Sequence, residues 1–170
     1  SGDGGLATSA KLNTCYDLAF DSANNLYICD NSNKRIRIVS ATNGVVGTAS
    51  IINTFAGTGG LAYNGDCSFR TSTQLVPISI SIDKFDNVYI SDVYSYIIIK
   101  FLRNGFSKKI NYNITNYILG LCFDSKGNLY ISDSNANNIS KITLSNLNAI
   151  NYSTALNPAT EKVNNLFSVD

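Results

Sequence analysis

One segment occurs three times in this chain, and the repeat constrains the fold more than any other feature. Each copy has an apolar run that ends in Asp, a polar turn, and a run of the form Asn-Leu/Val-Tyr-Ile. A second Asp closes the copy nine residues after the first. The copies span residues 18–30, 80–92 and 121–133. Because a repeated unit of this kind stacks on its neighbours, the repeat has to be interpreted before any single residue.

Each copy predicts a β-hairpin followed by two further strands. Turn-forming residues separate the two alternating runs of the hairpin. Third β-rich runs lie at 35–39, 96–101 and 139–143, and fourth runs at 50–55, 108–112 and 149–153. The first Asp of each copy recurs at intervals of 62 and 41 residues. Four antiparallel strands at such spacings are typical of a propeller blade.

Two stretches carry a resemblance to a known family. Residues 2–13 read Gly-Asp-Gly-Gly-Leu-Ala-Thr-Ser-Ala-Lys-Leu-Asn and residues 30–37 read Asp-Asn-Ser-Asn-Lys-Arg-Ile-Arg. Together with the hairpin between them, they closely resemble the linker, hairpin and third strand of an NHL repeat, and residues 57–75 repeat the linker pattern. Lys34 stands where the family usually has His, and 93–96 and 134–137 depart further. The resemblance implies a fold but not a function, since such propellers serve as enzymes, RNA binders, sensors and structural modules.

The predicted fold is therefore all-β, with about three four-stranded NHL-like blades plus one strand of a fourth. The expected blades span 12–56, 75–113 and 117–154, with linkers at 1–11 and 57–74 and the start of a fourth unit at 164–170. Closed propellers usually have at least four blades. We therefore expect the chain to be part of a larger protein or one unit of an assembly, in which Leu166–Val169 pairs with strands from elsewhere.

Composition agrees with a β protein that buries a substantial core. The chain has 170 residues, of which 44% are apolar, and no apolar run approaches the ~20 residues that a membrane helix needs. Only 15% of the residues are charged and the net charge is +1, which disfavours nucleic-acid binding. Lys34, Arg35 and Arg37 form one local basic cluster, which we interpret as a solvated or loop-anchoring face.

Three asparagines stand in N-glycosylation sequons: Asn113-Ile114-Thr115, Asn138-Ile139-Ser140 and Asn151-Tyr152-Ser153. Asn113 and Asn151 are predicted on or beside outermost strands, where a glycan is accessible and would discourage strand addition. Asn138 is predicted to begin a third strand, where neighbouring strands limit access. We therefore expect glycans at Asn113 or Asn151 before Asn138.

The four cysteines allow three complete pairings. Cys29 and Cys122 occupy positions filled by small residues in the other copies, and we expect both to be buried. Cys15 precedes an innermost strand and Cys67 lies in the linker to the next one, at the same end of a propeller. A Cys15–Cys67 disulfide is thus predicted first and Cys29–Cys67 second, with four free thiols as the alternative. With the sequons, the disulfide favours the secretory pathway.

The recurrent aspartates are interpreted as structural. Asp21, Asp83 and Asp124 end first strands and Asp30, Asp92 and Asp133 end second strands, places where a carboxylate accepts backbone N–H bonds and holds a turn. A catalytic group is needed once per site and not once per blade. The alternative is Ca²⁺ bound near a loop by an Asp, an Asn side chain or backbone carbonyls, although no EF-hand-like spacing is present.

The absence of histidine removes Ser-His-Asp and Cys-His catalysis and the His ligands of peptide-amidating propeller lyases. We predict no enzyme activity and no cofactor. The preferred function is an extracellular or cell-surface, glycosylated propeller module with a structural or protein-interaction role. Its expected partners are other proteins, or further copies or blades of the same protein. The alternative is the non-catalytic portion of a lyase-like or lactonase-like propeller enzyme, or of a sensor, whose working residues lie elsewhere.

Overall fold

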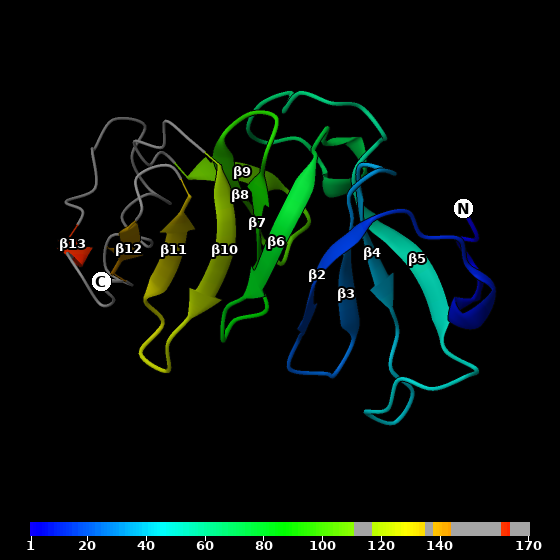
Figure 1. Ribbon diagram of the computed structural model, residues 1–170. Coiled ribbons are helices and arrows are strands. Elements are labelled where there is room, and N and C mark those ends of the chain that lie inside the picture. Colours follow the sequence, from blue (N-terminus) through cyan, green and yellow to red (C-terminus); the bar gives the residue numbers. More distant parts are fainter. Residues whose placement is uncertain (111–116, 135–137, 144–160, 164–170) are drawn as a thin grey trace.

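The computed structural model describes residues 1–110, 117–134, 138–143 and 161–163, and within these the protein is all-β. Its strands form three antiparallel sheets that stand side by side as propeller blades (Figure 1). The two helical elements of the described residues are single 3₁₀ turns, η1 (Ala7–Ser9) and η2 (Arg70–Ser72). No helix of this part is long and apolar enough to cross a membrane.

Blade 1 has five strands in the order β1-β5-β4-β3-β2. Their bounds are β1 (Gly5–Leu6), β2 (Cys15–Phe20), β3 (Leu26–Asp30), β4 (Arg35–Val39) and β5 (Ile51–Ala56). The predicted linker 1–11 thus contributes the edge strand β1, in which Leu6 pairs with Ile51. A two-residue strand has no periodicity from which the sequence could have indicated it.

Blades 2 and 3 have four strands each. Blade 2 contains β6 (Pro77–Ile82), β7 (Val88–Asp92), β8 (Ile97–Phe101) and β9 (Ser107–Ile110), in that order. Blade 3 contains β10 (Ile118–Phe123), β11 (Leu129–Asp133), β12 (Asn138–Ile142) and β13 (Glu161–Val163). The fourth strand of blade 3 thus lies beyond residue 154, where we predicted the blade to end. The predicted strand 149–153 and the predicted fourth unit 164–170 lie outside the described residues.

The strand registers confirm that the three hairpins are equivalent. Each first strand places its last residue opposite the first residue of the second strand: Phe20 opposite Leu26, Ile82 opposite Val88 and Phe123 opposite Leu129. The next-to-last residue of each first strand lies opposite the tyrosine of the second strand: Ala19 opposite Tyr27, Ser81 opposite Tyr89 and Cys122 opposite Tyr130. Each first strand also carries a register shift at the same place, so the repeat extends to the local irregularities.

The hairpin turns are shaped by left-handed residues at one repeated position. Asn24, Asp86 and Gly127 have φ of 62°, 60° and 83°. Asn, Asp and Gly are the residue types that enter this region at least cost. The three hairpin turns differ in sequence, but each has a residue that tolerates positive φ at the same position, so their backbones turn in the same way.

β2, β6 and β10 are the innermost strands, and β6 lies beside both of the others (Figure 1). The core consists of the layers between blades. One cluster joins the Tyr27 side of blade 1 to the Ile80 side of blade 2, and a second joins the Tyr89 side of blade 2 to the Leu121 side of blade 3. Stacking of adjacent blades, rather than a single central core, buries the apolar residues.

Candidate functional site

Adjacent blades meet at two interfaces, which we call the first joint (blades 1 and 2) and the second joint (blades 2 and 3). These joints show which side chains a covered blade face presents. In the second joint, Phe123 of blade 3 packs edge-to-face on Tyr89 of blade 2, with ring centroids 4.9 Å apart. Lys100 is buried there with its ammonium 5.1 Å from the Tyr89 ring centroid, and burial lowers the pKa of Lys100. Each blade therefore presents a Tyr face to the next blade and an aliphatic or Phe face to the preceding one.

Blade 1 leaves the inner part of its preceding face open. Leu18 is equivalent to Ile80 and Leu121, since these three lie opposite Ile28, Ile90 and Ile131. Leu18 is 57% exposed, whereas Ile80 is 3% and Leu121 is 8% exposed. Phe20 and Tyr16 on the same strand are also exposed. The outer part of this face is covered by Ala7 and Ala10 of the linker, which pack on the Ile28 cluster. We call the surface made by Tyr16, Leu18 and Phe20 the leading face.

Among the described residues, no further blade covers the Tyr face of blade 3, and we call this surface the trailing face. It contains an apolar hollow of about 290 Å³ lined by Gly120, Leu121, Cys122, Tyr130, Ile131, Ser132 and Ile139. Cys122 is exposed and Ile139 is partly exposed, although the equivalent Ile98 is completely buried. The expectation that Cys122 is buried was therefore wrong. Cys122 occupies the repeat position of Ala19 and Ser81, which lie on faces that meet the next blade, but no further blade among the described residues packs on Cys122.

A row of hydrogen bonds along the innermost strands ties the three blades together. The Asp17 carboxylate in β2 accepts bonds from the Ser79 hydroxyl (2.7 Å) and the Ile80 N–H (2.9 Å) in β6. The Ser79 hydroxyl oxygen in turn accepts a bond from the Leu121 N–H in β10 at 3.0 Å. Asp17, Ser79 and Gly120 are equivalent positions, so this row ends at blade 3, where glycine has no side chain to accept a bond.

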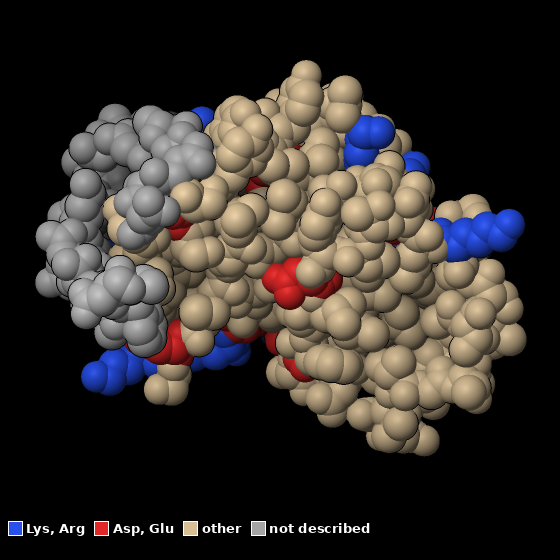
Figure 2. Space-filling model, in the orientation of Figure 1, with Lys and Arg blue, Asp and Glu red and all other residues tan. Residues whose placement is uncertain are grey.

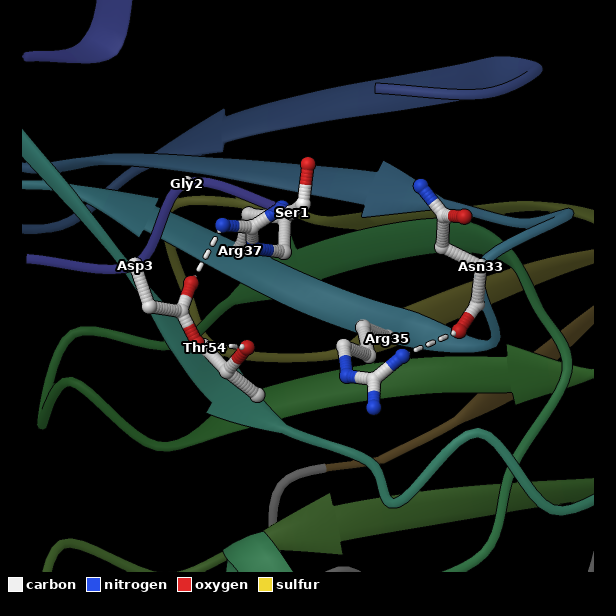
Figure 3. Close-up of a pocket in the computed structure, with 7 residues that line it drawn as sticks. All are labelled: Ser1, Gly2, Asp3, Asn33, Arg35, Arg37 and Thr54. Carbon is white, nitrogen blue, oxygen red and sulfur yellow. Dashed lines mark hydrogen bonds and ion pairs between the residues drawn. The ribbon is translucent and has the colours of Figure 1, made fainter. Parts of the chain in front are cut away.

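A polar cavity of about 320 Å³ lies at the outer part of blade 1 (Figure 3). Its lining includes Asp3, Asn33, Arg35, Arg37 and Thr54. The Arg37 side chain is only 1% exposed and forms ion pairs with Asp3 and with the fully buried Asp30. Burial raises the pKa of Asp3, but hydrogen bonding from Thr54 and the charge of Arg37 outweigh it and lower the pKa overall. Both carboxylates pair with the single guanidinium of Arg37, so we interpret the cavity as a structural ion-pair site.

Arg37 and Arg35 refine the interpretation of the basic cluster. Arg35 donates to the carbonyl oxygens of Asn33 (3.0 Å) and Thr58 (3.1 Å), which confirms loop anchoring for this residue. The burial of Arg37 was not predicted. Asp3, its partner, is 34 residues away in sequence, and blade 2 offers no precedent because Ile99 occupies the equivalent position. The DGG linker motif was the available signal for this pair.

The aspartates that end first strands serve the hairpins, as predicted. Asp21 accepts bonds from the Ala23 and Asn25 N–H groups and from the Tyr27 hydroxyl, and Asp83 and Asp124 repeat this set of contacts. Hydrogen bonds from the Asn128 side chain and backbone lower the pKa of Asp124. These carboxylate oxygens are therefore engaged within their own turns.

Two of the aspartates that end second strands, Asp30 and Asp92, hold the turn that follows and the residues that lead into the first strand. Asp30 accepts the Asn13 N–H, and Asp92 accepts the N–H groups of Val76 and Ser95, both at 2.6 Å. Burial raises the pKa of Asp92, which has no arginine at the Arg37 position of its blade. Within the described ranges no three His, Cys, Asp or Glu side chains gather as metal ligands would.

The predicted Cys15–Cys67 disulfide is absent, and all four cysteines are free thiols. Cys15 pairs with Asp30 on the innermost strand, whereas the Cys67 N–H donates to the Ser107 carbonyl on the outermost strand of blade 2. The two residues therefore lie at opposite edges of the blades, Cys15 on the innermost strand of blade 1 and Cys67 beside the outermost strand of blade 2. Cys29, the second candidate partner of Cys67, is completely buried in the first joint.

The glycosylation sites are only partly described. Asn113 and Asn151 lie outside the described residues. Asn138 begins β12, which lies between β11 and β13, and it is partly buried next to the buried Ser140. This position agrees with limited access at Asn138.

Comparison with solved structures shows the propeller fold. A protein of unknown function from Bacteroides thetaiotaomicron superposes with a TM-score of 0.64 at 18% identity, over 80% of this chain and 37% of that one. Virginiamycin B lyase from Staphylococcus aureus gives 0.61 at 12% identity, over 94% and 44%. A putative gluconolactonase gives 0.52 at 15% identity, over 85% and 47%.

The chain spans less than half the length of these similar structures. No known family's sequence profile and no curated protein sequence matches it. Identities this low establish the β-propeller fold alone, and a fold hosts many functions. Membership of the NHL family therefore stays a prediction.

Proposed function

We propose that this chain is a structural and protein-interaction module whose leading and trailing faces bind further propeller blades. The observation that carries the proposal is the exposure of Leu18 at a position that is buried in both internal joints. Burying one Leu or Phe side chain contributes about 1.5–3 kcal/mol. Leu18 and Phe20 together therefore offer a substantial driving force for docking, which the contacts within blade 1 leave unused.

The chemistry of the two faces fits blades better than other partners. The leading face is apolar and aromatic, and the trailing face is an apolar hollow beside Tyr130, with the Lys141 ammonium 5.9 Å from its ring centroid. Most of the surface seen in Figure 2 is uncharged. Contiguous apolar surface of this kind marks protein-binding sites. The partners we propose are further blades of the same protein or of other copies.

We assign the module no catalytic step and no cofactor. The carboxylates whose contacts are described accept bonds from turns, from Arg37 or from the neighbouring blade. Two of the similar structures are virginiamycin B lyase and a putative gluconolactonase, and this likeness supports part of a propeller enzyme as the second candidate function. In that case the working residues would lie outside this chain.

The module is also proposed to be extracellular or on the cell surface and to carry N-linked glycans. The sequons at Asn113, Asn151 and Asn138 support this proposal. Mass spectrometry of the protein from its native source, with and without deglycosylation, measures occupancy at each site. Glycans at Asn113 or Asn151 are expected, and unmodified asparagines at all three would contradict the secretory assignment.

Thiol labelling tests whether the trailing face is covered. In the native assembly, a soluble alkylating reagent followed by peptide mass spectrometry should modify Cys67 faster than Cys122. Both thiols are exposed in the structure, so a neighbouring blade is what would protect Cys122. The buried Cys29 is the internal control for unfolding, since its modification would reveal a denatured sample. Equal rates at Cys122 and Cys67 in a folded native assembly would refute the proposed function.

A further inference from the structure

We propose that the trailing face of one chain binds the leading face of a second copy, so that two copies close one propeller. This inference rests on the proposed function and names the partner. Each chain would supply both faces, giving two identical head-to-tail joints related by a twofold axis along the propeller. The second copy is favoured because the two open faces repeat the two sides of a joint that already exists within the chain.

The trailing face repeats the blade 2 side of the second joint. Strand registers make Tyr130 equivalent to Tyr89, and the lysines opposite them, Lys141 and Lys100, are also equivalent. Each lysine ammonium lies within 6 Å of its tyrosine ring centroid, at 5.9 and 5.1 Å. Ile139 stands where Ile98 stands in blade 2. A surface with these side chains already accepts a blade once in this molecule.

The leading face repeats the blade 3 side of the same joint. Leu18 and Phe20 occupy the positions of Leu121 and Phe123, in that order. Phe123 meets Tyr89 edge-to-face at an interplanar angle of 69°. We infer that Phe20 of a second copy enters the hollow beside Tyr130 and makes the same contact, the geometry that aromatic pairs prefer.

The backbone of the inner strands suits this joint in particular. In both internal joints an N–H of the following blade donates to a side chain of the preceding one, Ile80 to Asp17 and Leu121 to Ser79. At the new joint the corresponding acceptor position is Gly120, which has no side chain. The corresponding donor is the Leu18 N–H, which already donates to its own Asp17 carboxylate at 2.9 Å. Blade 3 can therefore meet blade 1 without leaving this donor unpaired on burial.

The size of the similar propellers fits two copies. The alignment with virginiamycin B lyase spans 94% of this chain and 44% of the lyase. The alignment with the Bacteroides protein spans 80% of this chain and 37% of that protein. Two copies thus approach the length of one of these structures. Head-to-tail contacts close into a ring when their rotation adds to a full turn, and otherwise they extend as fibres.

The first experiment measures the mass of the purified 170-residue chain by sedimentation equilibrium across a dilution series. A dimer is expected. Phe20→Ser should shift the equilibrium strongly to monomer, and Phe85→Ser should not. Phe85 is the matched control, since it is 53% exposed against 58% for Phe20 and lies at a hairpin turn away from both faces. Circular dichroism verifies that both variants are folded.

A charge exchange distinguishes head-to-tail contact from contact between like faces. Phe20→Asp spoils only the leading face and Cys122→Arg spoils only the trailing face, so each variant alone should be monomeric. Their mixture should form heterodimers, because one joint is then unaltered and the other places Asp against Arg. A Phe20→Asp monomer that no mixture rescues would overturn the head-to-tail joint.

The remaining outcomes separate this proposal from the proposed function. A chain that is monomeric at every concentration, while Cys122 is protected in the native assembly, overturns the second copy but leaves blade docking intact. Open oligomers that grow with concentration overturn the closed dimer. A dimer that survives Phe20→Ser unchanged overturns the assigned faces.

Discussion

Replacing Arg37 by isoleucine tests whether the buried ion pair stabilises the first blade. Blade 2 already carries isoleucine at the equivalent position, Ile99, so the fold accommodates this side chain in a related setting. The substitution removes the guanidinium that faces both Asp30 and Asp3. The expected result is a clear loss of stability without loss of the fold.

The magnitude follows from what remains around Asp30. Removing one partner of a buried ion pair costs about 3–5 kcal/mol. Asp30 keeps bonds from the Asn13 N–H at 2.8 Å and the Asn33 amide at 2.9 Å, which favours the lower limit. The Nε of Arg37 has no partner, and burying such a donor costs about 1–3 kcal/mol that isoleucine does not carry. The net loss is therefore about 2 kcal/mol.

Urea unfolding at pH 7, followed by circular dichroism, measures this loss, and an unchanged denaturant slope would show that the comparison is valid. Arg35→Ile is the matched control, because Arg35 donates only to carbonyls in its described contacts, and it should cost about 1 kcal/mol or less. The double variant Arg37→Ile with Asp30→Asn should recover more than half of the loss. A loss below about 0.5 kcal/mol in Arg37→Ile, or a double variant as unstable as the single one, would show that the pair does not act as described.

Three further predictions concern the joints and turns. Ser79→Ala removes the buried hydroxyl that links three blades and should lower the free energy of unfolding by about 1–3 kcal/mol in urea titrations, with the exposed Ser125→Ala as the control. Asp86 accepts two hydrogen bonds from Ser22, and these bonds lower the pKa of Asp86 below the usual 3.8. The stability that the ionised Asp86 contributes should therefore be fully present above pH 3.8 and be lost as the pH falls through the lowered pKa. The difference in unfolding free energy between wild type and Asp86→Ala, measured from pH 2.5 to pH 7, should therefore shrink in acid, and a constant difference would exclude this origin. Gly57→Ala should destabilise by more than about 1 kcal/mol, since φ is +103° and a Cβ would lie 2.5 Å from the Lys34 carbonyl oxygen; an unchanged melting temperature would contradict this geometry.

The sequence alone determined the hairpins. Each Asp-to-Asn turn is closed by contacts within five residues, such as Asp83 with Phe85 and Asn87, and the alternating Tyr-Ile run fixes which side of the strand each residue takes. Because these interactions are local and repeated, the propeller class and the equivalence of Tyr27, Tyr89 and Tyr130 followed from the pattern.

Tertiary structure decided which residues meet across the chain. Arg37 reads as a surface cation until Asp3 is brought to it, and Cys15 and Cys67 read as partners until the blade places them on opposite edges. Leu18 and Leu121 occupy the same position of the repeat, yet one is exposed and the other buried, because burial depends on whether a blade stacks against that face. A repeating pattern encodes the shape of each blade, whereas its neighbours decide which faces are left open.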